Sequence, residues 1–123
     1  MNPVVLAFVG DAVYTLFTRT KAAVGSDKKA NELNRESAEV VSAIAQAKKV
    51  DKLLSVLTED ELSIFKRARN AKKSTRAKNA SVSQYNKSTG FEAVLGYLYL
   101  TGQNERLSQL LRENESEGNQ DEN

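Results

Sequence analysis

The sequence predicts an all-α protein with a single domain. The chain has 123 residues with one Pro and six Gly, so long helices are unobstructed and the usual breaks of strand-and-turn folds are missing. Apolar residues recur at helical spacing along most of the chain. A chain of this length forms one domain with a small core.

The first helix is expected to begin at Pro3, with Asn2 as its N-cap, and to run to about Val24, before Gly25. Its apolar residues form more than one stripe, which indicates a helix covered on several sides. Gly10 lies inside this helix, where it costs about 1 kcal/mol relative to Ala. A Gly at such a position indicates that another backbone or a ligand comes close.

The middle of the chain contains several shorter patterns. A second helix is predicted from a cap at residues 26–27 to about residue 47, and a short third helix over residues 50–57. Residues 58–61, Thr-Glu-Asp-Glu, form a capping box that opens a fourth helix. From residue 70 to 87 the apolar period fails, which predicts a loop or a frayed helix end.

The C-terminal part is expected to hold two helices. The first spans residues 91–100, with Gly102 just beyond it, and the second is capped by Asn104 and runs through Leu111. The polar, acidic residues that follow are predicted to be disordered. The domain is therefore assigned to residues 1–112 and the acidic tail to residues 113–123.

The composition excludes several kinds of chemistry. The chain has no Cys, so disulfides, thiolate zinc sites and cysteine nucleophiles are ruled out. It has no His, the commonest general base. Carboxylates with a hard cation such as Mg²⁺ are the main catalytic option that remains. No long apolar run or basic leader is present, so we expect a cytoplasmic protein.

Two acids lie in apolar helical surroundings. Asp11 falls in the middle of the first helix, without a cation three or four residues away. A carboxylate in apolar packing is costly unless it is paired or bound to a metal ion, although it can also bond a neighbouring helix end. Glu92 opens another apolar helix, where the alternative is a capping box with Thr89.

The net charge of +2 conceals an uneven distribution. Between Leu62 and Phe91 there is no acid, and eight cations lie there. Residues 70–87, named the basic segment below, suit the phosphates of a nucleic acid, although a solvated loop would look similar. The candidate RNA-binding residues in it are Asn70, Lys72, Lys73, Arg76, Lys78 and Tyr85.

Two motifs resemble those of a known family. Residues 8–13, Phe-Val-Gly-Asp-Ala-Val, are similar to the signature segment of ribonuclease III catalytic domains, and residues 91–96, Phe-Glu-Ala-Val-Leu-Gly, to that family's second acidic motif. Residues 69–72 and 88–93 resemble the Mini-III subfamily, which has no double-stranded-RNA-binding domain. The resemblance spans residues 2 to about 111 and implies the family's all-helical catalytic fold.

The resemblance implies a metal-dependent endoribonuclease that cuts double-stranded RNA. Asp11 and Glu92 match two metal ligands of the family, and Mg²⁺ held there would activate water and polarise the scissile phosphate. The products would carry a 5′-phosphate and a 3′-hydroxyl. The family works as a homodimer whose signature Phe enters the partner subunit, a role that falls on Phe8. The subfamily's task is the maturation of precursor 23S ribosomal RNA.

The family usually draws on four acids, and this chain departs from that pattern. The acid of the second motif falls on Thr89, and two acids near the signature fall on Ala7 and Val4. Mini-III sequences generally share these losses, so they favour the subfamily and leave the number of metal ions open.

Two other classes of function remain at this stage. One is a non-catalytic ribonuclease III-like RNA-binding helical dimer, which would use the basic segment and need neither acid. The other is a purely structural helical dimer. A divalent-ion requirement for RNA cleavage separates the enzyme from the first, and salt-dependent RNA binding separates the first from the second.

Overall fold

The computed structural model describes residues 1–24, 43–73 and 81–121, with side chains described outside 43–45 and 114–121. The elements in these ranges are all helical, which confirms the all-α class. They are α1 (Pro3–Val24), α3 (Ala43–Leu53), the 3-10 turn η1 (Leu54–Val56), α4 (Glu59–Asn70), α5 (Val82–Leu100) and α6 (Asn104–Asp121). The predicted helix start at residues 26–27 and the predicted helix end at Gly25 lie outside the described residues.

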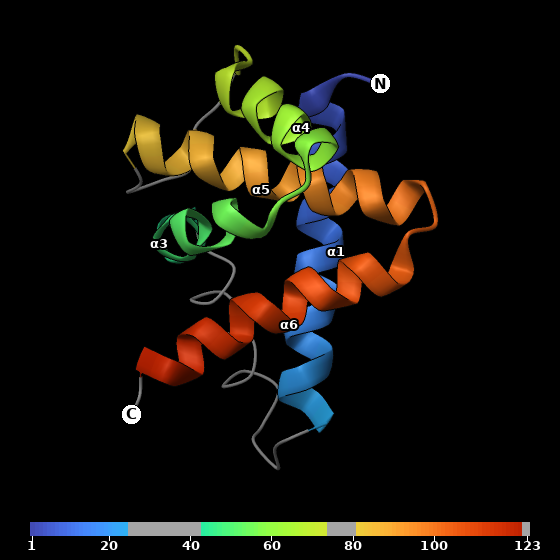
Figure 1. Ribbon diagram of the computed structural model, residues 1–123, viewed down its shortest axis with the longest axis vertical. Helices are drawn as coiled ribbons and strands as arrows, with labels where there is room; N and C mark the ends of the chain where they lie inside the picture. The colour runs from blue at the N-terminus through green and yellow to red at the C-terminus, as the bar shows by residue number, and fades with distance from the viewer. Residues whose placement is uncertain (25–42, 74–80, 122–123) are drawn as a thin grey trace.

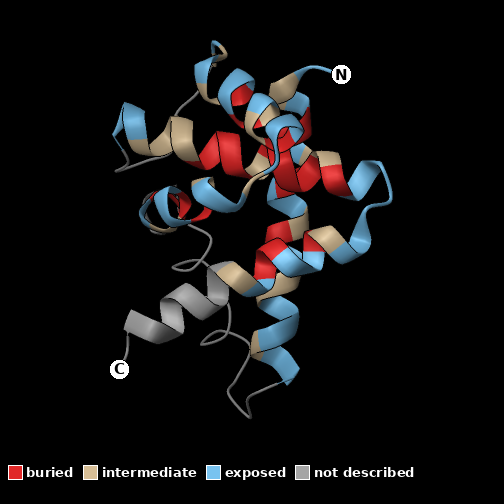
Figure 2. Ribbon diagram, viewed as in Figure 1, coloured by how far each residue is buried: buried red, intermediate tan, exposed pale blue. Residues whose placement is uncertain are grey.

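Helix α5 is the centre of the fold, since α1, α3, α4 and α6 all pack against it (Figure 1). The buried part of the molecule is concentrated along α5 and where α1 crosses it (Figure 2). Tyr14 of α1 meets Phe91 of α5 edge to face, with ring centroids 5.5 Å apart. The main core consists of Tyr14, Val50, Leu53, Phe65, Phe91, Val94, Leu95, Leu98, Leu107, Leu110 and Leu111.

Several helix ends form as predicted. The side chain of Asn2 accepts a hydrogen bond from the amide of Val4 over 2.8 Å, and thereby caps α1. The capping box at the start of α4 is present, with both of its hydrogen bonds. Helix α5 ends at Leu100. Gly102 follows it with a φ of 73°, which suits the residue after a helix, and the amide of Gln103 bonds back to the carbonyl of Leu98 over 2.9 Å.

The predicted start of α5 is wrong. The helix begins at Val82 and not at Phe91, because Ser81 and Gln84 form a capping box ahead of it. The apolar period fails there although the residues are helical, since small and polar residues occupy buried positions of the helix. Gly90, for example, lies so close to Phe65 that a Cβ would be 2.7 Å from the ring.

Two other boundaries differ from the prediction. Residues on both sides of Ala47 belong to one helix, α3, which ends at Leu53 and continues into η1. Helix α6 begins at Asn104 and runs to Asp121, beyond its predicted end at Leu111.

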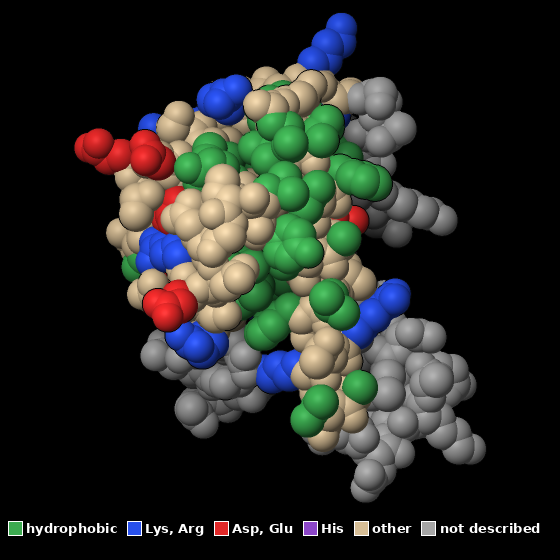
Figure 3. Space-filling view, turned by 90° about the vertical axis from the view of Figure 1, so that its right-hand side faces the viewer, with side chains coloured by type: hydrophobic (Ala, Val, Ile, Leu, Met, Phe, Trp, Pro, Cys, Tyr) green, Lys and Arg blue, Asp and Glu red, His purple; other side chains and the backbone are tan. Residues whose placement is uncertain are grey.

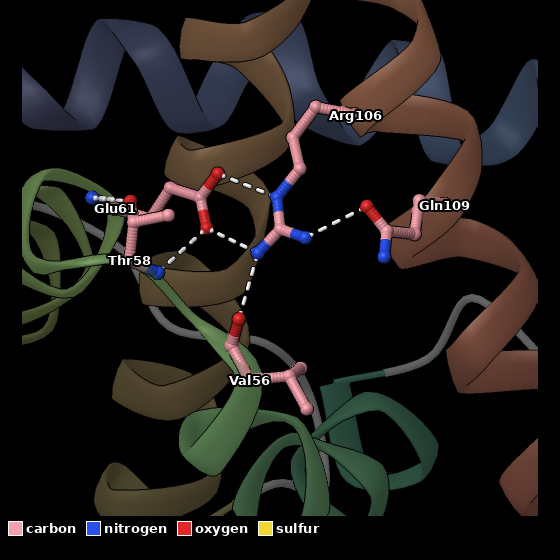
Figure 4. A network of polar contacts seen from close by, with 5 residues as sticks. All are labelled: Val56, Thr58, Glu61, Arg106 and Gln109. Carbon is pink, nitrogen blue, oxygen red and sulfur yellow. Dashed lines mark hydrogen bonds and ion pairs between the residues drawn. The ribbon is translucent and has the colours of Figure 1, made fainter.

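An ion pair fastens α6 to the start of α4 (Figure 4). Arg106 donates from Nε and Nη2 to the two carboxylate oxygens of Glu61, each over 2.8 Å, and from Nη2 to the carbonyl of Val56 over 2.7 Å. Glu61 is buried, and its hydrogen bonds with Arg106 lower the pKa of its carboxyl group. The bidentate geometry holds α6 over the core.

None of the helices in the described ranges is long and apolar enough to cross a bilayer.

Candidate functional site

The close crossing of α1 and α5 brings the two predicted acids together. A Cβ at Gly10 would overlap the carbonyl oxygen of Glu92, and a Cβ at Gly96 would overlap the carbonyl oxygen of Leu6. The two backbones therefore touch, which only Gly permits at these positions. This confirms that the Gly in the signature segment marks a close approach, and it places Asp11, the next residue of α1, beside Glu92.

The two acids have different surroundings. Asp11 is exposed, so its expected place inside apolar packing is wrong: the apolar residues around it in sequence include several that face solvent. Glu92 is half-buried. It lies in the middle of α5, so it cannot belong to a capping box with Thr89, and that alternative is wrong.

The pKa of Glu92 shows how the two carboxyl groups interact. Burial raises the pKa of Glu92 to about 9, with further contributions from its hydrogen bond to Asp11 and from the charge of Asp11. The nearby polar side chains of Gln46 and Ser88 oppose this rise. Glu92 therefore keeps its proton at neutral pH unless a cation takes the place of that proton.

The donor set fits a hard divalent cation. Mg²⁺ is commonly held by one or two carboxylates, with water and substrate phosphate completing its coordination. Asp11 and Glu92 provide such a pair, of which Asp11 is exposed and Glu92 is half-buried. Among the residues that the structure describes, no group of three or more His, Cys, Asp or Glu is placed to hold a metal ion. The protein therefore offers at most two acidic ligands from its described part.

Two of the positions without the family's acids are closed to a metal ion. Ala7 is buried with Leu6, Ala68 and Ala93 in a small apolar cluster. Thr89 is buried and donates its hydroxyl proton to the carbonyl of its own helix at Tyr85, over 2.9 Å. Val4, the third position, is half-buried near the start of α1.

The first half of the basic segment follows α4. Asn70 ends that helix and accepts a hydrogen bond from Nε of Arg69, over 3.1 Å. Lys72 is exposed. Lys73 instead turns back and donates to the carbonyls of Arg69 and Ala71, over 3.1 and 2.7 Å. Burial lowers the pKa of the Lys73 ammonium group. Lys73 therefore closes the C-terminal end of α4 in this structure.

The second half of the basic segment leads into α5. Arg76 and Lys78 lie outside the described residues. Tyr85 is half-buried on α5, about two helical turns before Glu92 and on the same side of the helix. Lys87 pairs with Asp51 of α3 over 3.0 Å, which fastens α3 to α5.

Exposed apolar side chains follow one face of α1. Phe8 is 80% exposed, although it is the residue expected to be covered by a partner subunit. Figure 3 shows hydrophobic side chains gathered in a band along the face on which α1 extends. The exposed large apolar residues at helical spacing along α1 are Val5, Phe8 and Leu16.

The structure adds Gln46 to the site, a residue that the sequence analysis missed. Gln46 is buried in α3 and contacts both Ser88 and Glu92. A signal was present: Gln46, Val50 and Leu53 have the spacing of one helix face, so a polar residue occupies a core position.

A family model and individual relatives both point to the same family of known proteins. The Ribonuclease III domain family matches residues 4–103. The Mini-ribonuclease 3 of Clostridium tetani is 44% identical over 113 residues, covering 91% of this chain and 75% of that protein. The Mini-ribonuclease 3 of Streptococcus pneumoniae is 47% identical over 113 residues, covering 90% and 88%.

A solved structure supports the same fold. A crystal structure of a protein from Fusobacterium nucleatum is similar with a TM-score of 0.83 and 28% identity, covering 91% of this chain and 89% of that one. The chain therefore belongs to the ribonuclease III family, in its Mini-ribonuclease 3 branch, and is an endoribonuclease.

Proposed function

We propose that this endoribonuclease cleaves double-stranded RNA in a Mg²⁺-dependent reaction at the carboxyl pair of Asp11 and Glu92. The observation that carries the proposal is the Gly10 crossing, which brings both acids to one place. Burial and the neighbouring acid raise the pKa of Glu92 to about 9. A cation bound between the two carboxyl groups would stabilise the ionised form of Glu92. Bound there, Mg²⁺ would supply an activated water and polarise the scissile phosphate.

The protein's own residues have separate tasks in this proposal. Asp11, exposed on α1, is the ligand within reach of solvent and substrate. Glu92 is fixed by its position in the middle of α5 and by its buried polar neighbours. Both are held by packed helices and not by loops, so little rearrangement is needed to form the site.

The active unit is proposed to be a homodimer in which each subunit cuts one strand. The apolar face of α1 supports this, because a large contiguous apolar patch is unusual on a monomer. Phe8 would become buried against the partner subunit, as the signature Phe does in the family.

The contacts that hold the RNA are proposed to come from the catalytic domain, residues 1–112. Lys72, Asn70 and Tyr85 are the described candidates, and Arg76 and Lys78 complete the set. The absence of acids from residue 62 to 91 favours the approach of phosphates. Double-stranded RNA would be recognised through its shape and backbone.

The biological substrate is proposed to be precursor 23S ribosomal RNA, with cleavage in the cytoplasm and products that carry a 5′-phosphate and a 3′-hydroxyl. The likeness to Mini-ribonuclease 3 proteins supports this assignment.

A direct test is incubation of the protein with a long RNA duplex, with Mg²⁺ and with a chelator, followed by analysis of the cut ends. We expect cleavage only with Mg²⁺, and ends that accept a 3′ ligation adaptor without prior dephosphorylation. Binding of the duplex without cleavage under any divalent ion would instead favour the non-catalytic RNA-binding dimer.

A further inference from the structure

Gln46 occupies a position in α3 where an apolar residue would be expected. It is 1% exposed and lies one and two helical turns before Val50 and Leu53, both in the core. A buried amide without hydrogen bonds costs roughly 1–3 kcal/mol in proteins, so a polar residue here has to be satisfied by specific partners.

The partners of Gln46 are on α5, at the active site. Ser88, itself 3% exposed, donates to Oε1 of Gln46 over 2.7 Å. Both Gln46 and Ser88 also lie within hydrogen-bond reach of the Glu92 carboxyl group. Ser88 and Glu92 are one helical turn apart, so the half-buried Glu92 lies in one cluster with the two buried side chains.

The direction of the hydrogen bonds follows from the number of protons. Ser88 has one hydroxyl proton, and it goes to Oε1 of Gln46. The amide Nε2 of Gln46 is then the group left to donate to Glu92. A carboxylate that accepts from a fixed amide has one of its oxygens held, and the rotation of its side chain is restricted.

The neutral charge of Gln46 matters as well. Lys or Arg at this place would hold Glu92 but would also neutralise it and compete with a metal cation. A neutral amide restricts the carboxyl group and leaves it free to ionise when a metal cation binds.

We propose that Gln46 is a positioning residue: locked by Ser88, its amide orients the carboxyl group of Glu92 toward Asp11, so that the two acids present a preformed site for a divalent cation. This inference rests on the proposed metal-dependent function. Partners that orient metal ligands typically contribute about 10–100-fold to metal affinity or activity.

The test is the binding of Mg²⁺ and Mn²⁺ to the RNA-free protein, measured by calorimetry, in Gln46→Met and Ser88→Ala variants. Gln46→Met keeps the length of the side chain and removes the amide. Ser88→Ala removes only the hydroxyl that holds the amide, and remains informative where Gln46→Met does not fold. We expect the dissociation constant of the metal ion to rise about tenfold or more in Gln46→Met, and less in Ser88→Ala. Cleavage by both variants should recover in part at high Mg²⁺.

The matched control is Asp51→Asn, which breaks another link between α3 and α5, the ion pair with Lys87, and does not contact Glu92. It should bind metal ions as the unaltered protein does. In addition, Gln46→Met should cause no further loss of metal binding when combined with Glu92→Gln, because Gln46 acts through Glu92.

Metal affinity that is unchanged in both folded variants, or reduced equally in Asp51→Asn, would overturn the inference and leave the proposed function intact. Failure of the unaltered protein to bind a divalent ion or to cut RNA would contradict the proposed function itself.

Discussion

Gly10 of α1 and Glu92 of α5 touch through their backbones, and a side chain at Gly10 would overlap the carbonyl oxygen of Glu92. The same crossing would bring a Cβ at Gly10 to 2.9 Å from the backbone nitrogen of Gly96. Because neither neighbour is the flexible end of a side chain, the helices themselves would have to separate.

Gly10→Ala is therefore expected to destabilise the fold, although Ala favours an exposed helix by about 1 kcal/mol over Gly. Overpacking typically costs about 1–3 kcal/mol, and contact between two backbones belongs at the upper end. Thermal unfolding and Mg²⁺ binding should both be measured, since separation of α1 from α5 also moves Asp11 away from Glu92. A gain in melting temperature would show that the crossing is looser than described.

Asp11→Asn and Glu92→Gln should each abolish cleavage of an RNA duplex while the helical content by circular dichroism remains unchanged. The reason is that each replaces a carboxyl group of the proposed metal-binding pair by an amide, which cannot become anionic, and keeps the size of the side chain. Asp51→Asn, an exposed acid on α3, is the control and should cut normally. Near-normal cleavage by either active-site variant in Mg²⁺ would refute the site.

The pKa of Glu92 predicts how the metal-free protein responds to pH. The folded state keeps a proton to about pH 9 that the unfolded chain releases near its ordinary value of 4.5. Folded protein thus binds more protons in this window, and its stability falls as the pH rises through it. Glu92→Gln cannot lose that proton.

With a chelator present, Glu92→Gln should melt at a higher temperature than the unaltered protein at about pH 8, by roughly 4 °C or more, and the difference should shrink toward about pH 5. Mg²⁺ should stabilise the unaltered protein and not the variant. Parallel melting curves at both pH values would contradict a raised pKa for Glu92.

Phe8→Ala should weaken the dimer with little effect on the fold of one subunit, because Phe8 is 80% exposed in the single chain. Loss of one buried aromatic side chain corresponds to roughly 1.5–3 kcal/mol, or about 10–100-fold in affinity. A homodimer loses two, so the dimer dissociation constant should rise by at least this factor. Analytical ultracentrifugation measures this. Val56→Ala, which shortens an exposed apolar side chain away from α1, should leave the dimer unchanged, and an undiminished Phe8→Ala dimer would remove Phe8 from the interface.

Neutralising Lys72, Arg76 and Lys78 together should raise the dissociation constant for duplex RNA, while turnover at saturation changes less. Each lost phosphate contact should also flatten the plot of log affinity against log salt by about 0.9 in B-DNA, and comparably in an RNA duplex. Lys48→Gln, an exposed cation on α3, is the control.

Lys73→Gln should in addition lower the melting temperature, because Lys73 closes the end of α4. If the affinity and the salt slope of the variant at Lys72, Arg76 and Lys78 are unchanged, the RNA is held by other residues.

Asp11 and Glu92 could be predicted as site residues from the sequence, because both lie in short recognisable motifs. The close approach at Gly10 could also be predicted, because Gly is unfavourable inside a helix unless another group comes close. The exposure of Asp11 could not be predicted from the sequence. An apolar helix covered by a partner subunit and one covered by its own chain have the same composition, so the side that faces solvent cannot be read from the pattern.

The start of α5 and the role of Gln46 were missed for a related reason. Ser88, Thr89 and Gly90 are buried, yet none is hydrophobic, and the apolar period fails where the core is locally polar or crowded. The partner of Gln46 is 42 residues away in sequence, so only the packing of α3 on α5 reveals it.

The uninterrupted run of α5 from its cap at Ser81 past Glu92 has a geometric consequence for cleavage. The basic segment ends inside the helix that contains Glu92, the proposed metal ligand. The angle about the helix axis between the two is therefore set by the number of residues that separate them. One residue inserted between Tyr85 and Ser88 would turn the two parts by about 100° and shift them by about 1.5 Å, with every functional side chain still present. In the proposed arrangement, the number of residues in this helix thus sets the distance and the angle between the place where the RNA is held and the place where it is cut.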